Sequence, residues 1–494
     1  MSGPRYPSLY QINTRVWLTE LAGALGRPAT LDDIPDAALD RLAEQGFDWI
    51  WLLSVWQTGP EAREVSRTRP EWLADFRATL PDLTDEDIPG SGFAITGYSV
   101  HEALGGDAAL AALRKRLQDR GLKLMLDFIP NHMGLGHPWA QTHPEHFVEG
   151  TESDRSRAPQ NYTLVKRKQG DLIFAHGRDP FFDGWPDTLQ LNYANPATQE
   201  ALIGELERIA GQCDGLRCDM AMLVLPEVFE RTWGLRAQDF WPAATRRVRE
   251  RVPGFCFLAE VYWELEWTLQ QQGFDYAYDK RLYDRLREQH ARPVREHFHA
   301  GLDYQDKLAR FVENHDEGRA AVAFPAGVHE AAAIITYLAP GLRFFHRGQF
   351  EGRKKRISPH LGRGPVEPTD ETLSRFYDKL LTVLRNPVFR EGQWQLLECV
   401  PAWEGNWTHD CFVAFGWQGV GNQRAIVAVN YAGNQSQCHA RLPFDELDRK
   451  QWRLHDQMSG TTYDWSGDDL RTRGLYLDMG PWQAAVFELR ERES

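Results

Sequence analysis

The sequence predicts an α/β fold, a (β/α)8 TIM barrel with an inserted subdomain after its third strand and a C-terminal antiparallel β-sandwich domain. Three observations lead to this prediction. Short apolar segments rich in β-forming residues alternate with helical segments along the first four fifths of the chain. A long segment without that alternation follows the third apolar segment. The last part of the chain consists of short strand-like segments separated by turn residues.

Eight apolar segments are predicted as the barrel strands. Amphipathic helices are indicated between them by apolar residues at three- and four-residue steps, most clearly in 107–121, 197–212 and 371–386. Repeated strand–helix units give a parallel sheet, and eight of them close into a barrel. The predicted strands are 8–18, 47–55, 123–132, 215–221, 255–262, 274–279, 307–316 and 342–349.

Two regions depart from the alternation. Residues 133–192 are rich in Gly, His, Pro and aromatics and are too long for an ordinary strand–helix loop, so we expect a subdomain at the C-terminal mouth of the barrel. Helical periodicity stops near residue 390, which predicts a separate antiparallel domain over 391–494. The catalytic barrel is then expected to consist of 1–132 and 193–390.

Composition excludes several classes of protein. The net charge of −14 disfavours nucleic-acid binding, which requires a basic surface. No secretory signal and no bilayer-spanning apolar run is visible, so no membrane partner is expected. The six cysteines match neither a disulfide framework nor a CxxC metal site, which predicts reduced thiols in a cytoplasmic protein.

Polar residues gather where the predicted strands end, and barrel enzymes carry their chemistry at these C-terminal ends. One such residue is usually structural, but several carboxylates, histidines and an arginine that converge on one mouth predict a functional site. The third strand ends with Asp127, Asn131 and His132, the fourth with Arg217 and Asp219, the fifth with Glu260, and the seventh with Asn314, His315, Asp316 and Arg319.

Two of these carboxylates suit retaining glycoside cleavage, in which one attacks the anomeric carbon and the other protonates the leaving oxygen. Arg217 and Asp219 lie two apart in a strand and so share a face. The arginine favours an ionised Asp219, as a nucleophile requires. Glu260 stands between apolar residues, and we expect it to lie away from positive charge and to hold a proton.

The remaining polar residues fit sugar binding better than metal binding. Asp316 could stabilise an oxocarbenium-like transition state, and His132 and His315 could donate hydrogen bonds to ring hydroxyls. Zinc is disfavoured because His315 and Asp316 are adjacent and face opposite ways, and because no HExxH motif or cysteine cluster is present.

Four motifs together resemble the α-amylase superfamily, glycoside hydrolase family 13, over almost the whole chain. They are DFIPNH (127–132), GLRCD (215–219), AEVYW (259–263) and ENHDEGR (313–319); PGLRFFHRGQFEG (340–352) and TLQLN (188–192) are also similar to family segments. The resemblance implies that Asp219 is the nucleophile, Glu260 the acid/base and Asp316 the stabiliser. Arg217, His132 and His315 would then support them.

The resemblance also implies substrate and metal contacts. Phe93 stands where relatives carry a tyrosine that stacks on the sugar, and Asp127, Trp263 and Arg319 are expected to bind substrate. Asn131 holds the position of a calcium ligand, which suggests a structural Ca2+ completed by acids of the insertion, although no cofactor is required for catalysis. After the nucleophile, Met220, Met222 and Leu223 replace the polar residues of typical amylases and offer an apolar surface.

A short basic segment, 347–364, is expected on the catalytic face. It could bind phosphate, as barrel loops after strands 7 and 8 often do, or its cations could pair with neighbouring acids. We therefore expect a retaining hydrolase acting on α-glucosidic bonds of gluco-oligosaccharides or disaccharides, with a small carbohydrate as its partner. The alternatives are a transglycosylase or phosphorylase that uses the same glycosyl-Asp intermediate, and a non-catalytic sugar- or partner-binding relative.

Overall fold

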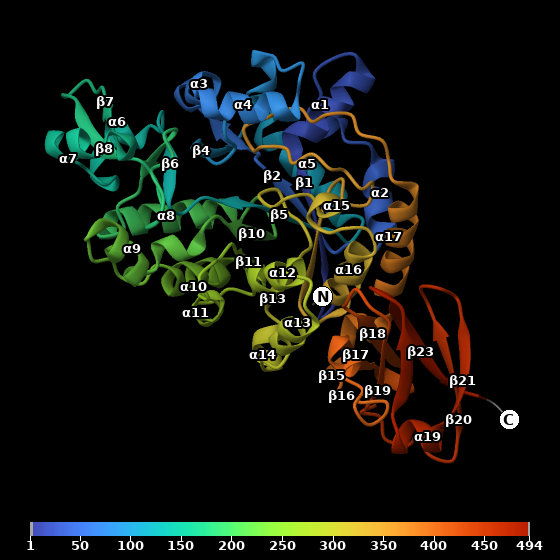
Figure 1. Cartoon of the computed structure of the whole chain (residues 1–494). Coiled ribbons are helices and arrows are strands. Elements are labelled where there is room, and N and C mark those ends of the chain that lie inside the picture. Colours follow the sequence, from blue (N-terminus) through green and yellow to red (C-terminus); the bar gives the residue numbers. More distant parts are fainter. Residues whose placement is uncertain (1–2, 493–494) are drawn as a thin grey trace.

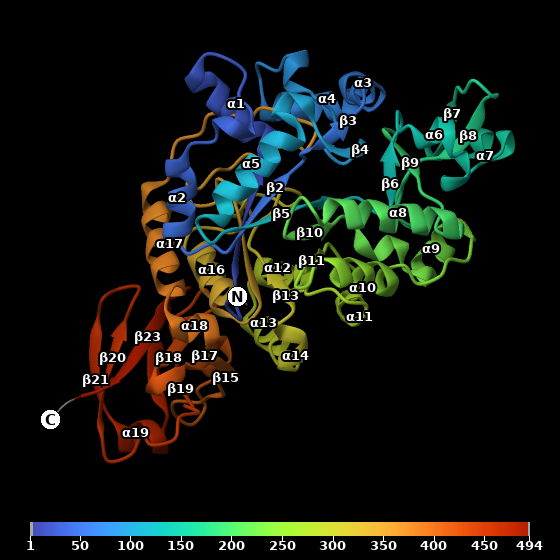
Figure 2. The ribbon, with the colours of Figure 1, turned by 180° about the vertical axis from the view of Figure 1, so that it is seen from behind.

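The computed structural model describes residues 3–492 and contains a closed barrel of eight parallel strands. The inserted segment and the C-terminal domain lie at opposite ends of this barrel in both views (Figures 1 and 2). The predicted barrel is confirmed. In spatial order its strands are β1 (Ser8–Asn13), β14 (Leu342–His346), β13 (Leu308–Arg310), β12 (Tyr276–Tyr278), β11 (Cys256–Ala259), β10 (Gly215–Cys218), β5 (Lys123–Phe128) and β2 (Trp49–Leu53).

The barrel strands are apolar because both of their faces are covered. Every residue of β2 and of β10 is buried, as expected when side chains fill the interior and helices cover the outside. Gly341 allows the chain to turn into β14, because its φ is 111° and an added Cβ would lie 2.3 Å from the carbonyl oxygen of Leu308.

The helices around the barrel start with recognisable caps. Asn195 accepts a hydrogen bond from the backbone N–H of Ala197 at the start of α8, and Asp370 caps α17 in the same way. None of the helices in the described part of the chain is long and apolar enough to cross a bilayer. The helices around the barrel are α1 (Thr14–Leu25), α2 (Asp36–Glu44), α5 (Gly106–Gln118), α8 (Pro196–Ile209), α9 (Pro226–Trp233), α10 (Trp241–Arg251), α11 (Glu266–Gln271), α12 (Lys280–Arg287), α13 (Ala291–His297), α14 (Leu302–Gln305), α15 (Ala320–Ala323), α16 (Val328–Leu338), α17 (Glu371–Leu384) and α18 (Pro387–Glu391).

The insertion after β5 is built on two antiparallel strand pairs. β6 (His132–Gly134) pairs with β9 (Thr188–Gln190), and β7 (Tyr162–Val165) pairs with β8 (Leu172–Ala175). Two short helices, α6 (Trp139–Thr142) and α7 (Glu152–Arg157), complete it. Because β6 starts only four residues after β5 ends, the first strand pair stands directly on the barrel mouth.

A second elaboration, which the sequence analysis did not predict, follows β2. It contains α3 (Pro60–Thr68) and α4 (Pro70–Thr79) between the paired strands β3 (Trp56–Thr58) and β4 (Ile95–Val100). Both helices begin at a proline, which is favourable in a first helical turn. Apolar side chains of α4 and of the segment that follows it meet the segment after β14 in a small separate core formed by Phe76, Leu80, Ile88 and Leu361.

The C-terminal domain is the predicted antiparallel sandwich. Side chains from a six-stranded and a three-stranded sheet form one core, to which α19 (Gly467–Thr472) contributes Leu470. The larger sheet has the order β15 (Gln393–Leu396), β17 (Phe412–Gln418), β18 (Arg424–Asn430), β23 (Ala484–Glu491), β20 (Gln451–Asp456), β21 (Thr462–Ser466), and the smaller has the order β16 (Cys399–Val400), β19 (Ser436–Ala440), β22 (Leu475–Met479).

Trp417 joins this domain to the barrel. Its fully buried indole donates a hydrogen bond from Nε1 to the carbonyl oxygen of Leu338, the last residue of α16, at 2.9 Å. Its ring also meets the ring of Tyr6 edge-on at 5.2 Å. One side chain therefore contacts the N-terminal segment, a barrel helix and the sandwich.

Replacing Trp417 by alanine is expected to lower the free energy of unfolding by about 3–5 kcal/mol, because a large cavity opens at this junction. The matched control is Trp407→Ala: that indole is 66% exposed, and its removal should change stability by no more than about 0.5 kcal/mol. Urea unfolding followed by circular dichroism measures both. Equal effects of the two substitutions would contradict this role for Trp417.

Candidate active site

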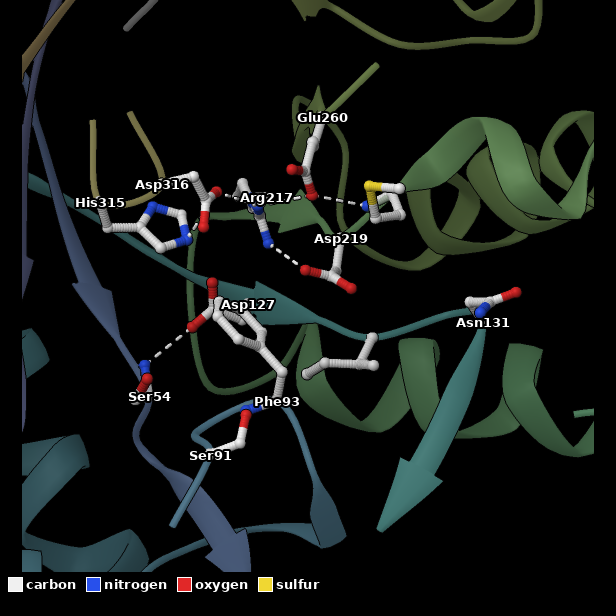
Figure 3. A network of polar contacts seen from close by, with 12 residues as sticks. Ser54, Ser91, Phe93, Asp127, Asn131, Arg217, Asp219, Glu260, His315 and Asp316 are labelled. Atoms are coloured by element: carbon white, nitrogen blue, oxygen red, sulfur yellow. Dashed lines mark hydrogen bonds and ion pairs between the residues drawn. The ribbon is translucent and has the colours of Figure 1, made fainter. Parts of the chain in front are cut away.

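Arg217 occupies the centre of the site and is completely buried. Its Nη1 donates to Oδ1 of Asp219 at 2.7 Å, and its Nη2 donates to Oε2 of Glu260 at 2.6 Å (Figure 3). Nη2 also lies 4.0 Å from Oδ2 of Asp316. A single guanidinium thus holds the predicted nucleophile and acid and lies beside the predicted stabiliser.

Aromatic rings enclose this guanidinium. Its carbon lies 5.3 Å from the ring centres of Trp51 and Phe93 and 5.8 Å from that of Tyr278. Cation–π attraction stabilises the charge in the absence of water. The hydroxyl of Tyr278 also accepts a hydrogen bond from Nε at 3.3 Å. Arg217 is therefore fixed in one position by contacts on several sides.

Glu260 differs from the expectation in one respect. It was expected to lie away from positive charge, which is wrong, because Arg217 binds it directly. Burial nevertheless raises the pKa of Glu260 to about 8, and the nearby carboxylates of Asp219 and Asp316 add to the rise, while Arg217 opposes it. One buried cation cannot balance three acidic groups that converge on it, so the most strongly buried of them, Glu260, keeps a proton.

The contacts of Glu260 show which oxygen is able to carry this proton. Oε2 already accepts from Arg217 and from the backbone N–H of Met220, the latter at 2.7 Å. Oε1 has a single neighbour, the hydroxyl of Tyr262 at 2.8 Å, which can donate or accept. The proton of a neutral Glu260 therefore belongs on Oε1.

Asp219 and Asp316 reach the same centre from β10 and β13. The backbone N–H of Asp219 donates to the carbonyl oxygen of Phe128 at 2.8 Å, which anchors the chain where β10 ends. Burial raises the pKa of Asp316. His315, adjacent to it, places Nε2 3.2 Å from Oδ2 of Asp316 and binds Gln11 through Nδ1.

These groups open into a cavity of about 300 Å³. Asp219, Glu260 and Asp316 line it together with Phe93 and His132, so five of the predicted residues meet there. Burial lowers the pKa of His132 and of His315, which keeps both imidazoles neutral. A larger hollow of about 780 Å³, lined by Tyr10, Trp17 and Phe350 among others, includes none of these carboxylates.

Five of the residues predicted to bind substrate do not line the cavity. Arg217 and His315 contact its carboxylates instead, and the other three have different partners. Asp127 accepts hydrogen bonds from Nε1 of Trp51 and the backbone N–H of Ser54, and burial raises its pKa to about 7. Arg319 is buried against Glu313, 3.0 Å away. Trp263 is 38% exposed and packs on Phe181 of the insertion. The motifs locate these residues correctly along the chain but do not reveal where the side chains point.

The apolar surface predicted after the nucleophile is also smaller than expected. Met220 lines the cavity, and its φ of 41° turns the chain sharply after Asp219. Met222 and Leu223 are buried in the barrel core instead. Of the three predicted residues, only Met220 lines the cavity, together with Tyr262.

The contacts of Asn131 give no support to a calcium site. Asn131 lies apart from the carboxylates in Figure 3, and its Oδ1 accepts a hydrogen bond from Gln190 at 3.0 Å. Three acids of the insertion have other partners: Asp154 binds Thr151 and Arg157, Asp179 accepts from the backbone N–H groups of Phe181 and Phe182, and Asp183 accepts from Gln160. A fourth, Asp187, is buried, lines the catalytic cavity and has one oxygen without a partner.

Most cations of the basic segment 347–364 have acidic partners. Arg347 and Arg353 both bind Glu20, and Arg363 binds Asp82 and Asp87. Arg356 approaches Asp75 at 3.8 Å and lies near the carbonyl oxygen of Asp316. These contacts match the expectation of paired charges on an acidic protein better than a phosphate site.

The sequence analysis missed one wall of the cavity. Trp72 of α4 and His360 of the segment after β14 line it, with ring centres 4.5 Å apart. Nδ1 of His360 also lies 2.9 Å from the hydroxyl of Ser66 on α3. No local pattern signals this wall, because its two halves are almost 300 residues apart in the chain.

The comparison with known families agrees with this geometry. The family model described as "Alpha amylase, catalytic domain" matches residues 34–356. This range is well over half of the chain and includes Asp219, Glu260 and Asp316. The chain belongs to the alpha-amylase family.

The curated proteins similar to this chain include an alpha-amylase and a trehalose synthase/amylase. An alpha-amylase of Haloarcula japonica is 24% identical over 360 residues, which cover 71% of this chain and 49% of that protein. A trehalose synthase/amylase of Mycobacterium tuberculosis is 29% identical over 212 residues, covering 39% and 34%. The chain thus spans at most about half the length of these two relatives.

Solved structures of amylases share the fold. The alpha-amylase of Geobacillus thermoleovorans, complexed with acarbose, matches with a TM-score of 0.68 at 20% identity, covering all of both chains. A maltogenic alpha-amylase of Thermotoga neapolitana matches with a TM-score of 0.69 at 16% identity, covering 98% of each chain. The barrel, the insertion and the C-terminal domain of this chain therefore form an alpha-amylase-like fold.

Replacing Arg217 by methionine is expected to lower the free energy of unfolding by about 3–5 kcal/mol, because it leaves buried acids without their cation. The control is Arg453→Met, which breaks an Arg–Asp pair of similar length (2.9 Å) whose arginine is 48% exposed; it should cost at most about 1 kcal/mol. Urea unfolding at neutral pH compares them. A loss from Arg217→Met no larger than the control's would refute a central role for this cation.

Proposed function

We propose that the protein is a retaining glycoside hydrolase that cleaves α-glucosidic bonds of gluco-oligosaccharides or disaccharides by double displacement. The observation that carries this proposal is the guanidinium of Arg217 shared by Asp219 and Glu260. Two carboxyl groups on one guanidinium suit the separation of about 5–5.5 Å used by retaining enzymes better than the wider spacing of inverting ones.

In the first step, a carboxylate oxygen of Asp219 attacks the anomeric carbon while Oε1 of Glu260 gives its proton to the glycosidic oxygen. The bond between the anomeric carbon and the glycosidic oxygen breaks, and the leaving sugar departs as an alcohol. A β-linked glycosyl ester forms on Asp219. Charge that develops on the ring is stabilised by Asp316. The raised pKa of Glu260 keeps this proton available near neutral pH.

In the second step, Glu260 is a carboxylate and acts as the base. It takes a proton from water, whose oxygen attacks the anomeric carbon from the face that the leaving group vacated. The ester bond to Asp219 breaks, and the sugar is released in the α configuration, which amounts to overall retention. Glu260 regains its proton and Asp219 its charge.

The wall formed by Trp72 and His360 supports action at chain ends. The leaving group departs toward Glu260, so the ring that stays on Asp219 points to the other side of the cavity. We place this ring against the wall formed by Trp72 of α4 and His360 of the segment after β14, which both line the cavity. A cavity of about 300 Å³ is at the low end for small-molecule sites. A non-reducing terminal glucosyl unit therefore fits better than the middle of a chain.

Transfer to a sugar acceptor is the second candidate. It is favoured by the relatives named trehalose synthase/amylase. It differs from hydrolysis only in the second step, in which a sugar hydroxyl instead of water attacks the glycosyl ester. The assembled carboxylates argue against a non-catalytic binding protein, and the paired cations of 347–364 argue against phosphorolysis.

The proposed location is the cytoplasm, because all six cysteines are free thiols.

Asp219→Asn and Glu260→Gln are expected to separate the two roles. Glu260→Gln should reduce cleavage of unactivated glucosides by about 10²–10⁴-fold, yet retain glycosylation by α-glucosyl fluoride, whose leaving group needs no proton. Asp219→Asn should be inactive on both substrates. Asp171→Asn, which alters an acid of the insertion outside the cavity, is the control and should match the parent. Near-full turnover by Asp219→Asn on either substrate would overturn the assignment.

A malto-oligosaccharide whose non-reducing end is blocked by a 4,6-acetal should resist cleavage, while the unblocked chain loses glucose from that end. Trp72→Ala should restore part of the lost cleavage, because it removes one half of the closing wall. Product NMR follows both substrates and reports the anomer released. Rapid internal cleavage of the blocked chain by the parent protein would show that the cavity does not impose action at chain ends.

A further inference from the structure

Three metal-ligating side chains gather away from the catalytic cavity, in the segment 143–146 of the insertion. They belong to His143, Glu145 and His146, and their ligand atoms lie within 4.8 Å of one another. Nδ1 of His143 is 3.1 Å from Oε1 of Glu145, and the two imidazole rings stack with centres 5.2 Å apart. Within residues 3–492, no other group of three His, Cys, Asp or Glu side chains meets this spacing.

The spacing suits a transition metal. Two bonds of about 2.0–2.1 Å at a tetrahedral angle place their ligand atoms about 3.4 Å apart. Nδ1 of His143 and Oε1 of Glu145, 3.1 Å apart, are close to this separation. Their side chains are each 54% exposed, so small rotations can bring both toward His146 without disturbing the core.

His146 is oriented for this role by its surroundings. It is 6% exposed, and its Nδ1 lies 3.1 Å from the hydroxyl of Thr198 on α8. This hydrogen bond occupies one ring nitrogen and leaves Nε2 as the ligand, the usual arrangement behind a metal-bound histidine.

We propose that His143, Glu145 and His146 bind a divalent transition metal of the zinc class, with water completing the coordination. Two imidazoles and one carboxylate suit zinc, whereas calcium and magnesium prefer oxygen ligands alone. None of the three residues lines the catalytic cavity, so the site is structural. It is independent of the proposed glycosidase activity.

Such a metal would fasten the base of the insertion to the barrel. The backbone N–H of Asn192 donates to the carbonyl oxygen of His146 at 2.8 Å. The side-chain amide of Asn195 donates to the backbone carbonyl oxygen of Glu145 at 2.9 Å. Just before Asn192, Gln190 of β9 pairs with His132 of β6. A metal at 143–146 would thus stiffen the strand pair that carries a residue of the cavity.

The test is titration of chelator-treated full-length protein with zinc chloride in a calorimeter, using the Asp219→Asn variant to weaken any binding at the catalytic carboxylates. One zinc per chain is expected. His143→Ala and Glu145→Gln, both exposed positions that leave the Thr198 hydrogen bond intact, should each weaken binding by at least about tenfold. His299→Ala, an exposed histidine elsewhere, is the control and should bind like the parent.

Hydrogen exchange supplies a second readout. Zinc should slow exchange of amides in 143–149 and 190–198 in the parent and not in His143→Ala. Absence of saturable binding would overturn the proposal and leave His143 and Glu145 as an ordinary surface pair. Binding that both ligand variants retain unchanged would also overturn it, because the zinc would then lie elsewhere.

Discussion

The active site depends on a shortage of positive charge. Arg217 is the guanidinium at which Asp219, Glu260 and Asp316 converge, and it is sealed from water by Trp51, Phe93 and Tyr278. Three ionised acids beside one cation would leave buried negative charge without compensation. This cost is lower when one of the acids stays protonated. The proposed division of labour between a charged nucleophile and a neutral acid follows from this imbalance.

The barrel fixes that arrangement through strand register. Arg217 lies directly beside Leu258 in the β10–β11 pair, so Asp219 and Glu260, each two residues further along, emerge next to each other. This part of the site was predictable from sequence, because strand ends are local patterns and barrel topology brings them together. The same reasoning found Asp316 and His132, which lie in the segments that follow β13 and β5.

The directions of individual side chains and the contacts between segments far apart in the chain were not predictable from the sequence. Arg319 and Trp263 belong to the right motifs, but their side chains turn to Glu313 and Phe181, contacts that no local pattern encodes. The wall of Trp72 and His360 joins two segments whose apolar residues meet only in the folded chain. The barrel thus determines the proposed chemistry, while its insertions shape the cavity and the proposed metal site.

The central claim is that Glu260 is protonated and Asp219 ionised in the resting protein. Neutron diffraction from a crystal exchanged into D2O at neutral pD would observe this directly. We predict a deuteron on Oε1 of Glu260, beside the hydroxyl of Tyr262, and none on either oxygen of Asp219. A deuteron on Asp219, or an ionised Glu260 with no deuteron on either oxygen, would contradict the account.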